Sequence, residues 1–176
     1  MLRKLEFDEI FKNRPSLQEL ENMPRTPVVA MIENVRSMHN VGSIFRSSDG
    51  ARIEQLILSG FTPVPPRPEI SKTALGSTES VPWMYVKNSV KKINELKQNG
   101  YTIYTVEQTT ESQVYSKVEY KFPLCFIMGN EVDGVSEELI SKTDYAIEIP
   151  MLGTKHSLNV SVAYGIVLYD MLAKYM

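Results

Sequence analysis

The sequence contains little of what disulfide-bonded and metal-binding proteins depend on. Only one of its 176 residues is cysteine, Cys125, and only two are histidine, His39 and His156. A single cysteine excludes an intramolecular disulfide framework, and its place in the apolar run LCFIM favours a buried, unreactive thiol. The two histidines are isolated from one another and from any cluster of ligating residues, so we expect no metal centre.

Long apolar runs are missing as well. Residues 1–25 lack the hydrophobic segment of a secretion signal, and no later stretch approaches the length of a membrane span. We therefore expect a cytoplasmic protein. Its expected organisation is a short polar helical arm over residues 1–25, followed by a single domain over residues 26–176.

Two further absences concern nucleotides and nucleic acids. No G-x-G-x-x-G follows an expected strand and no G-x-x-x-x-G-K-[ST] occurs, so a cofactor would have to be held by another device. The formal net charge is −2, without the basic excess typical of nucleic-acid-binding domains. Basic residues do gather in one third of the chain, either as a local RNA-binding patch or as an ordinary solvated face: Arg25, Arg36, Arg46, Arg52, Arg67 and Lys72.

What is present is an alternation of short β-branched runs with helical patterns. The helical patterns cover residues 40–50, 88–100 and 136–143, and a proline-rich stretch over residues 61–70 is expected to form an extended surface loop. Several strands are apolar on both faces, which indicates an α/β fold with a mostly parallel sheet flanked by helices. The predicted strands are 27–33, 55–60, 83–86, 101–107, 124–129 and 145–151.

The first chemically suggestive segment is HNVGSIFRSSDGARI, residues 39–53. We expect Asn40 to cap a helix that closes on Gly50, with Val41, Ile44 and Phe45 facing the core. Gly42 lies one turn before Arg46 and leaves that arginine open. Taken alone, a solvated arginine and a simple capping asparagine are the commoner readings of such residues.

The second segment is FIMGNEVDGVS, residues 126–136. A strand ends at Gly129, a loop follows, and Ser136 caps a helix with an acidic first turn. Glu131 lies outside that helix, beyond the carboxyl end of the strand, where open α/β sheets bind their ligands. An acidic turn without a role is the alternative.

The third segment is IPMLGTKHSLNVSVAYGIVLYDML, residues 149–172. A loop leads into a helix at about residues 157–159, and Ser157 and Asn159 at its entrance can orient a ligand. The helix is apolar nearly all round, which favours a homodimer contact over complete burial. One apolar stripe consists of Leu158, Val162, Ile166, Tyr169, Leu172 and Ala173.

In order and spacing, the three segments resemble motifs 1, 2 and 3 of the SpoU/TrmH branch of the SPOUT superfamily of RNA methyltransferases. The resemblance extends from about Val28 to the C-terminus. It implies a deep trefoil knot in the C-terminal part, an S-adenosylmethionine site formed by that knot, and a homodimer. It also implies methylation of a ribose 2′-hydroxyl in tRNA or rRNA.

The resemblance assigns site residues by position. The catalytic set would be Asn40, Arg46, Glu131, Ser157 and Asn159. Cofactor contacts would come from Thr105, Val106, Glu107, Gly129, Ile149, Met151, Ser157 and Leu158. Candidate RNA-binding residues are Arg36, Arg46, Arg52, Arg67 and Lys72.

Arg46 has been regarded as the base in this family, but a guanidinium is effectively always protonated. We expect Arg46 to bind an RNA phosphate and to stabilise developing oxyanion charge, and Glu131 to organise the site by accepting hydrogen bonds from Asn40 or Asn159. The expected substrate is tRNA, because many rRNA enzymes of the family carry an extra N-terminal domain. The alternatives are rRNA methylation, base methylation, and a non-catalytic module that binds S-adenosylmethionine or RNA.

Overall fold

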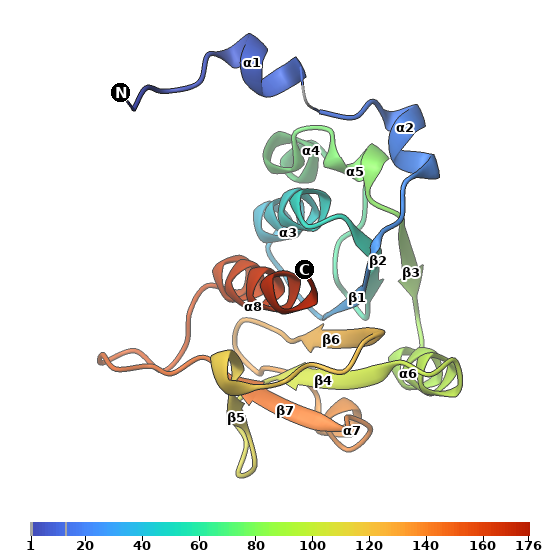
Figure 1. Cartoon of the computed structure of the whole chain (residues 1–176). Helices are drawn as coiled ribbons and strands as arrows, with labels where there is room; N and C mark the ends of the chain where they lie inside the picture. Colours follow the sequence, from blue (N-terminus) through green and yellow to red (C-terminus); the bar gives the residue numbers. More distant parts are fainter. Residues whose placement is uncertain (1, 13) are drawn as a thin grey trace.

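The computed structural model describes residues 2–12 and 14–176 and shows one seven-stranded sheet flanked by helices (Figure 1). The strand order is β3-β2-β1-β6-β4-β7-β5, and every strand pairing is parallel. The strands are β1 (Thr26–Glu33), β2 (Ile53–Ser59), β3 (Trp83–Val86), β4 (Thr102–Val106), β5 (Gln113–Val114), β6 (Leu124–Met128) and β7 (Tyr145–Glu148). The helices are α1 (Phe7–Lys12), α2 (Leu17–Asn22), α3 (Met38–Gly50), α4 (Pro68–Ala74), α5 (Ser77–Ser80), α6 (Ser89–Gln98), α7 (Glu137–Ile140) and α8 (Val160–Tyr175), with a 3-10 turn, η1 (Tyr115–Lys117).

The sheet is buried on both faces, as the doubly apolar strands predicted. In β1, Val28, Ala30 and Ile32 pack on the side of α3, α4 and α8, whereas Val29 and Met31 pack on the side of α6 and α7. Alternate side chains of a strand point to opposite faces, so a strand covered on both sides must be apolar throughout.

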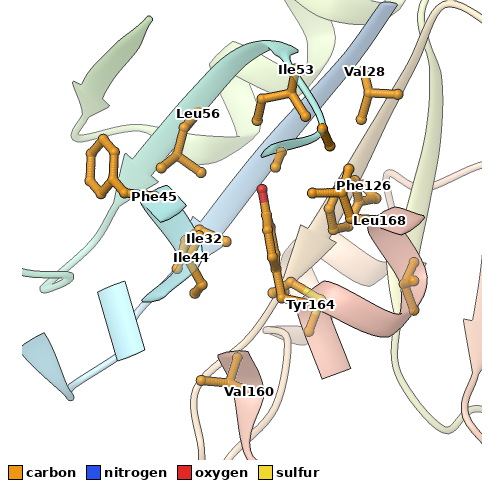
Figure 2. Close-up of a cluster of buried hydrophobic side chains, with 14 of the residues drawn as sticks. Val28, Ile32, Ile44, Phe45, Ile53, Leu56, Phe126, Val160, Tyr164 and Leu168 are labelled. Atoms are coloured by element: carbon orange, nitrogen blue, oxygen red, sulfur yellow. The ribbon is translucent and has the colours of Figure 1, made fainter. Parts of the chain in front are cut away.

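The C-terminal helix α8 completes the core on the α3 side. Figure 2 shows Tyr164 and Leu168 of α8 pointing among Phe126 of β6 and Ile44 of α3. The buried Tyr164 hydroxyl lies 2.5 Å from the hydroxyl of Ser48, so neither polar group is left unpaired. Burial raises the pKa of the Tyr164 phenol, and this residue is therefore a neutral core residue.

All seven strands end at one edge of the sheet because they are parallel. The loops that follow β1, β2, β4, β6 and β7 therefore meet at this carboxyl edge, which is where the three sequence segments come together. Cys125 lies in the middle of β6 instead, fully buried, and burial raises the pKa of its thiol, as expected for an unreactive cysteine.

The six predicted strands are confirmed, with small shifts at their ends, and the short strand β5 was missed. The proline-rich stretch is only partly a loop, because α4 begins at Pro68. Proline is well suited to the first turn of a helix, where its missing N–H has no partner to lose. The expected N-terminal helices are present as α1 and α2, neither of which contains a buried residue (Figure 1).

Two expectations about α3 are wrong. Ser37 caps the helix by accepting a hydrogen bond from the Asn40 N–H at 3.3 Å, and Asn40 itself lies in the first turn. Gly50 is the last helical residue, and the left-handed residue that follows is Arg52, with φ of 51°.

Gly42 serves a different purpose from the one expected. It is buried against α4, where a Cβ atom would collide with the Thr73 hydroxyl and the Ile70 carbonyl. The absence of a side chain thus permits close packing of α3 on α4.

None of the helices in residues 2–12 and 14–176 combines the length and apolar character of a membrane span.

Candidate active site

A cavity of about 290 Å³ opens at the carboxyl edge of the sheet. Its walls come from the ends of β4, β6 and β7, from the loops that follow them, and from the start of α8. Four carboxylates line it, Glu107, Glu131, Asp133 and Glu148, and no lysine or arginine of residues 2–12 and 14–176 does. The apolar lining is provided by Val106, Met128, Val132, Ile149, Met151, Leu158, Val160 and Ala163.

Glu131 joins the loop after β6 to the start of α3. Its carboxylate accepts hydrogen bonds from the Arg36 N–H at 3.0 Å, the Ser37 N–H at 3.2 Å and the Asn40 side-chain amide at 3.2 Å. These residues are more than 90 positions away in the chain. The predicted bond from Asn40 to Glu131 is therefore present, whereas Asn159 does not reach the carboxylate directly.

Asn159 continues the same network into the third segment. Its amide donates to the Asn40 side-chain oxygen at 3.1 Å, and its own oxygen accepts from the Ser161 N–H at 2.9 Å, which caps α8. The orientation of both amides follows from this chain of bonds, because a carboxylate can only accept. Glu131, Asn40 and Asn159 thus connect all three segments by side-chain hydrogen bonds.

The environment keeps Glu131 ionised. Partial burial by itself would raise the pKa of this carboxyl group, but the hydrogen bonds from Arg36, Ser37 and Asn40 together outweigh it and lower the pKa below its usual value. A permanent negative charge at this position holds the three donors in place.

Two further contacts brace the cavity. The Glu107 carboxylate accepts from the Val135 N–H at 3.1 Å and so fixes the loop after β6. Gln108 donates to the His156 carbonyl at 2.6 Å and ties the loop before α8 to the end of β4. Gly129 is needed at the base of the loop, because a Cβ atom there would collide with the backbone of Gly134 and Val135.

Most of the predicted cofactor residues line the cavity, namely Val106, Glu107, Gly129, Ile149, Met151, Ser157 and Leu158. Thr105 does not. It is fully buried within β4, and its hydroxyl has no hydrogen-bond partner within the described part of the chain. The side chain before a lining residue in a strand points to the opposite face, so its burial follows from the strand geometry.

The structure separates the predicted catalytic set. Glu131 and Ser157 line the cavity, and Asn40 and Asn159 adjoin it through their bonds. Arg46 lies six residues beyond Asn40 in α3, about 9 Å along the helix. Its side chain is exposed and makes no hydrogen bond or ion pair within residues 2–12 and 14–176.

The five candidate RNA-binding residues do not form one patch. Arg36 and Arg67 line a second cavity of about 550 Å³ at the same edge of the sheet. Lys72 is exposed on α4. Arg52 lies beyond the other end of α3, where it donates to the Pro24 carbonyl, because the residue before β2 is at the amino edge of a parallel sheet.

Sequence reasoning missed Asn130 and Gln108. Asn130 accepts hydrogen bonds from the N–H groups of Val132 and Asp133 and donates to the Asn34 carbonyl at 2.7 Å, which shapes the loop around Glu131. Asparagine between glycine and a polar turn is a recognised turn signal, so this role was open to prediction. The role of Gln108 has no local sequence signal.

No group of three or more metal-ligating side chains comes together in the described residues.

The chain is similar in sequence to several known proteins. The model of the SpoU rRNA methylase family matches residues 27–169. A protein of Staphylococcus aureus named for the TrmH family of tRNA/rRNA methyltransferases is 30% identical over 169 residues, 96% of this chain and 65% of the relative. A 23S rRNA (guanosine-2′-O-)-methyltransferase of Neisseria meningitidis is 31% identical over 165 residues, 93% of this chain and 66% of the relative. The chain thus spans slightly less than two thirds of the length of these relatives.

Solved structures show the same architecture. The Aquifex aeolicus TrmH/SpoU tRNA modifying enzyme superposes with a TM-score of 0.81 at 32% identity, covering 90% of this chain and 81% of that one. An S-adenosylmethionine-bound rRNA methyltransferase from Sinorhizobium meliloti gives a TM-score of 0.78 at 26% identity, covering 86% and 59%. The predicted α/β fold class is confirmed.

Proposed function

Because the chain belongs to the SpoU rRNA methylase family, we propose that it transfers a methyl group from S-adenosylmethionine to a ribose 2′-hydroxyl of RNA. The knotted C-terminal topology expected from the sequence comes with this fold. The observation that carries the proposal is the hydrogen-bonded set Glu131–Asn40–Asn159 beside a carboxylate-lined cavity.

The cavity suits S-adenosylmethionine in charge and in polarity. The cofactor carries a positive sulfonium, and four carboxylates without a lysine or arginine give the cavity the complementary sign. Ile149, Met151 and Leu158 provide apolar surface for an adenine ring. When bound, the cofactor supplies an electrophilic methyl group, so no activating metal is required.

The residues around the cavity would act mainly by positioning. Methyl transfer is an in-line displacement, and its rate depends on aligning the hydroxyl, the methyl group and the leaving sulfur. Asn40 and Asn159 are held by Glu131 and by the cap of α8, so their amides are fixed before substrate arrives. Ser157 at the mouth of the cavity is exposed and free to bond the ribose.

Arg46 is assigned to an RNA phosphate. The exposed guanidinium has no partner within the described residues, and its planar donor fork matches a phosphate. The oxyanion role expected from the sequence would require the side chain to reach the cavity, and Arg46 is not among the described residues of a single chain that line it. Proton removal from the hydroxyl is therefore left to water or to a phosphate.

We favour tRNA as the substrate. A relative named as a tRNA modifying enzyme covers 90% of this chain at 32% identity, the highest identity among the solved structures compared above. The second candidate is rRNA, because the Neisseria meningitidis relative is named as a 23S rRNA methyltransferase.

We further propose a homodimer formed through α8. The face of this helix that points away from the core carries Val162 and Tyr169, which are 51% and 49% exposed. Leu158 extends this apolar surface at the entrance of the helix. Apolar side chains of this size on one helix face are typical of a subunit contact.

The test is labelled-methyl transfer from S-adenosylmethionine to total RNA from a host that lacks this protein, followed by digestion to nucleosides. A labelled 2′-O-methylated nucleoside in the tRNA fraction supports the proposal, and label in the rRNA fraction supports the second candidate. Asn40→Ala serves as the matched inactive variant and should lose about 100-fold or more in rate. Cofactor binding with no transfer to any RNA would favour a non-catalytic module, and label on a base would overturn ribose methylation.

A further inference from the structure

The second cavity combines aromatic rings with arginines, and none of the described residues that line it is acidic. It lies where β2 and β3 end, at the same edge of the sheet as the first cavity, and measures about 550 Å³. We call it the Phe61 cavity. The residues that line it are Arg36, Met38, Gly60, Phe61, Thr62, Pro63, Val64, Arg67 and Tyr85. Its charge is therefore opposite to that of the first cavity.

Its aromatic side chains are left exposed by the fold. Phe61 is 57% exposed and Tyr85 is 46% exposed, although both adjoin a well-packed sheet. The Arg36 guanidinium lies 5.8 Å from the centroid of the Phe61 ring. An aromatic face beside an arginine plane is the arrangement with which proteins stack unpaired nucleotide bases.

The position of Phe61 is set by hydrogen bonds on both sides. Its N–H donates to the Asn34 side-chain oxygen at 3.1 Å, and the Tyr85 hydroxyl donates to the Gly60 carbonyl at 2.7 Å. Gly60 adopts φ of 64°, and a Cβ atom there would collide with the Asn34 amide. Thr62 is buried and bridges the Val35 N–H and the Ile32 carbonyl, both at 3.1 Å. The ring is thus presented by a braced turn.

The Phe61 cavity is linked to the active site through Arg36. Arg36, whose side chain lies over Phe61, donates its backbone N–H to Glu131 at 3.0 Å. Arg36 thus lines the Phe61 cavity and is hydrogen-bonded to Glu131, which lines the first cavity.

We propose that the Phe61 cavity binds the base of an unpaired nucleotide adjacent to the one whose ribose is methylated. The base would stack on the Phe61 ring next to Arg36, and Arg67 would bind the neighbouring phosphate. This inference rests on the proposed function and refines its substrate class, because a base can enter such a cavity only from a loop or another single-stranded segment. Stacking uses the π-face that every base has, so the site selects unpaired structure over base identity.

The test compares RNA binding by Phe61→Ala with that of a matched control. Phe11→Ala removes an equally exposed ring, 51%, that also has an arginine, Arg14, above it, but lies in the N-terminal arm. We expect the Kd for a host tRNA transcript, measured with S-adenosylhomocysteine present, to rise about 5- to 100-fold in Phe61→Ala. It should stay near the wild-type value in Phe11→Ala and in Phe61→Trp, which keeps a stacking surface.

Two further measurements separate stacking from charge. Arg67→Ala should reduce the slope of log K against log salt by about 1, whereas Phe61→Ala should leave the slope unchanged. A fully paired RNA duplex should bind wild type and Phe61→Ala alike. Equal tRNA affinities of wild type and Phe61→Ala would overturn the inference even if methyl transfer is intact, whereas the expected Kd pattern without any methyl transfer would overturn only the proposed function.

Discussion

Asn40 and Asn159 show how much of this site depends on single amide groups. Asn40 donates to Glu131 and accepts from Asn159, and Asn159 also accepts from the Ser161 N–H at the start of α8. Because the Glu131 carboxylate can only accept, it sets the direction of all these hydrogen bonds. An aspartate at position 40 would offer a second carboxylate where Glu131 requires a donor. Residue identity here matters more than size.

The charge of Glu131 yields a prediction about pH. Hydrogen bonding outweighs partial burial and lowers the pKa of this group in the folded protein, so its contribution to stability is complete above the unfolded-state pKa of about 4.3 and is lost as the pH falls through the lowered value. The difference in unfolding free energy between wild type and Glu131→Gln, measured with urea, should therefore be constant from pH 6 to 8 and shrink below about pH 4.3. Glu119→Gln, at an exposed glutamate, is the control. Parallel curves for wild type and Glu131→Gln down to pH 3 would contradict this prediction.

Substitution of Arg46 should change the reaction rate and leave the stability of the protein unchanged. Arg46→Lys keeps the positive charge but loses the paired donors, so we expect kcat/KM for RNA to fall about 10- to 100-fold. The melting temperature should not change, because the side chain is exposed and unpartnered within residues 2–12 and 14–176. Arg52→Lys, at the opposite edge of the sheet, should behave as wild type. Near-full turnover of Arg46→Lys would show that bidentate binding is not needed.

At the scale of elements, α3 packs closely on α4, and Gly42 makes this contact possible. Gly42→Ala would force the Cβ atom against the Thr73 hydroxyl and the Ile70 carbonyl, and backbone cannot move aside as a flexible side chain can. We expect a loss of about 1–3 kcal/mol in the free energy of unfolding. Gly165→Ala in α8 is the matched control, because only Ser47 Oγ lies near, at 3.9 Å, and helix propensity then favours alanine by up to about 1 kcal/mol. Equal losses in both variants would show that helix packing is not the cause.

The helices also show which local signals were read and which were not. Ser136 caps α7 as predicted, whereas the capping of α8 by Asn159 was not predicted. Ser37 was overlooked as the cap of α3 because Asn40 has the same capping chemistry three residues later. The start of α4 was overlooked because Pro68 follows other prolines that do form a loop.

For the whole molecule, the parallel sheet places two cavities of opposite charge side by side at one edge. The carboxylate-lined cavity suits a cationic cofactor, and the Phe61 cavity suits a polyanion. This division makes a net charge of −2 compatible with the proposed action on RNA. Binding of RNA should accordingly be confined to this edge.

The assembly proposed through α8 can be tested directly. Sedimentation of wild type should give twice the 20.0 kDa mass of the chain, and Val162→Lys should give the monomer mass, because a charge cannot be buried unpaired in an apolar contact. Leu17→Lys changes a residue of α2 with similar exposure, 50%, and should remain dimeric. A monomeric wild type, or a dimeric Val162→Lys, would contradict the proposed interface.

The sequence by itself determined the α/β class and six of the seven strands, because strand burial follows from the local side-chain pattern. Its resemblance to a known family named most of the residues that meet at the site, but not Asn130 or Gln108. Only the tertiary structure decided which of them touch. The bonds of Glu131 to Arg36 and Asn40, the packing of Gly42 on α4, and the pairing of Arg36 with Phe61 each join separate elements. Thr105 and Arg52 were assigned by position along the chain, yet strand alternation and strand direction place them away from the site. The side-chain pattern of a segment predicts which of its residues are buried. The residues that the segment contacts depend instead on the order and direction of strands far from it in the sequence.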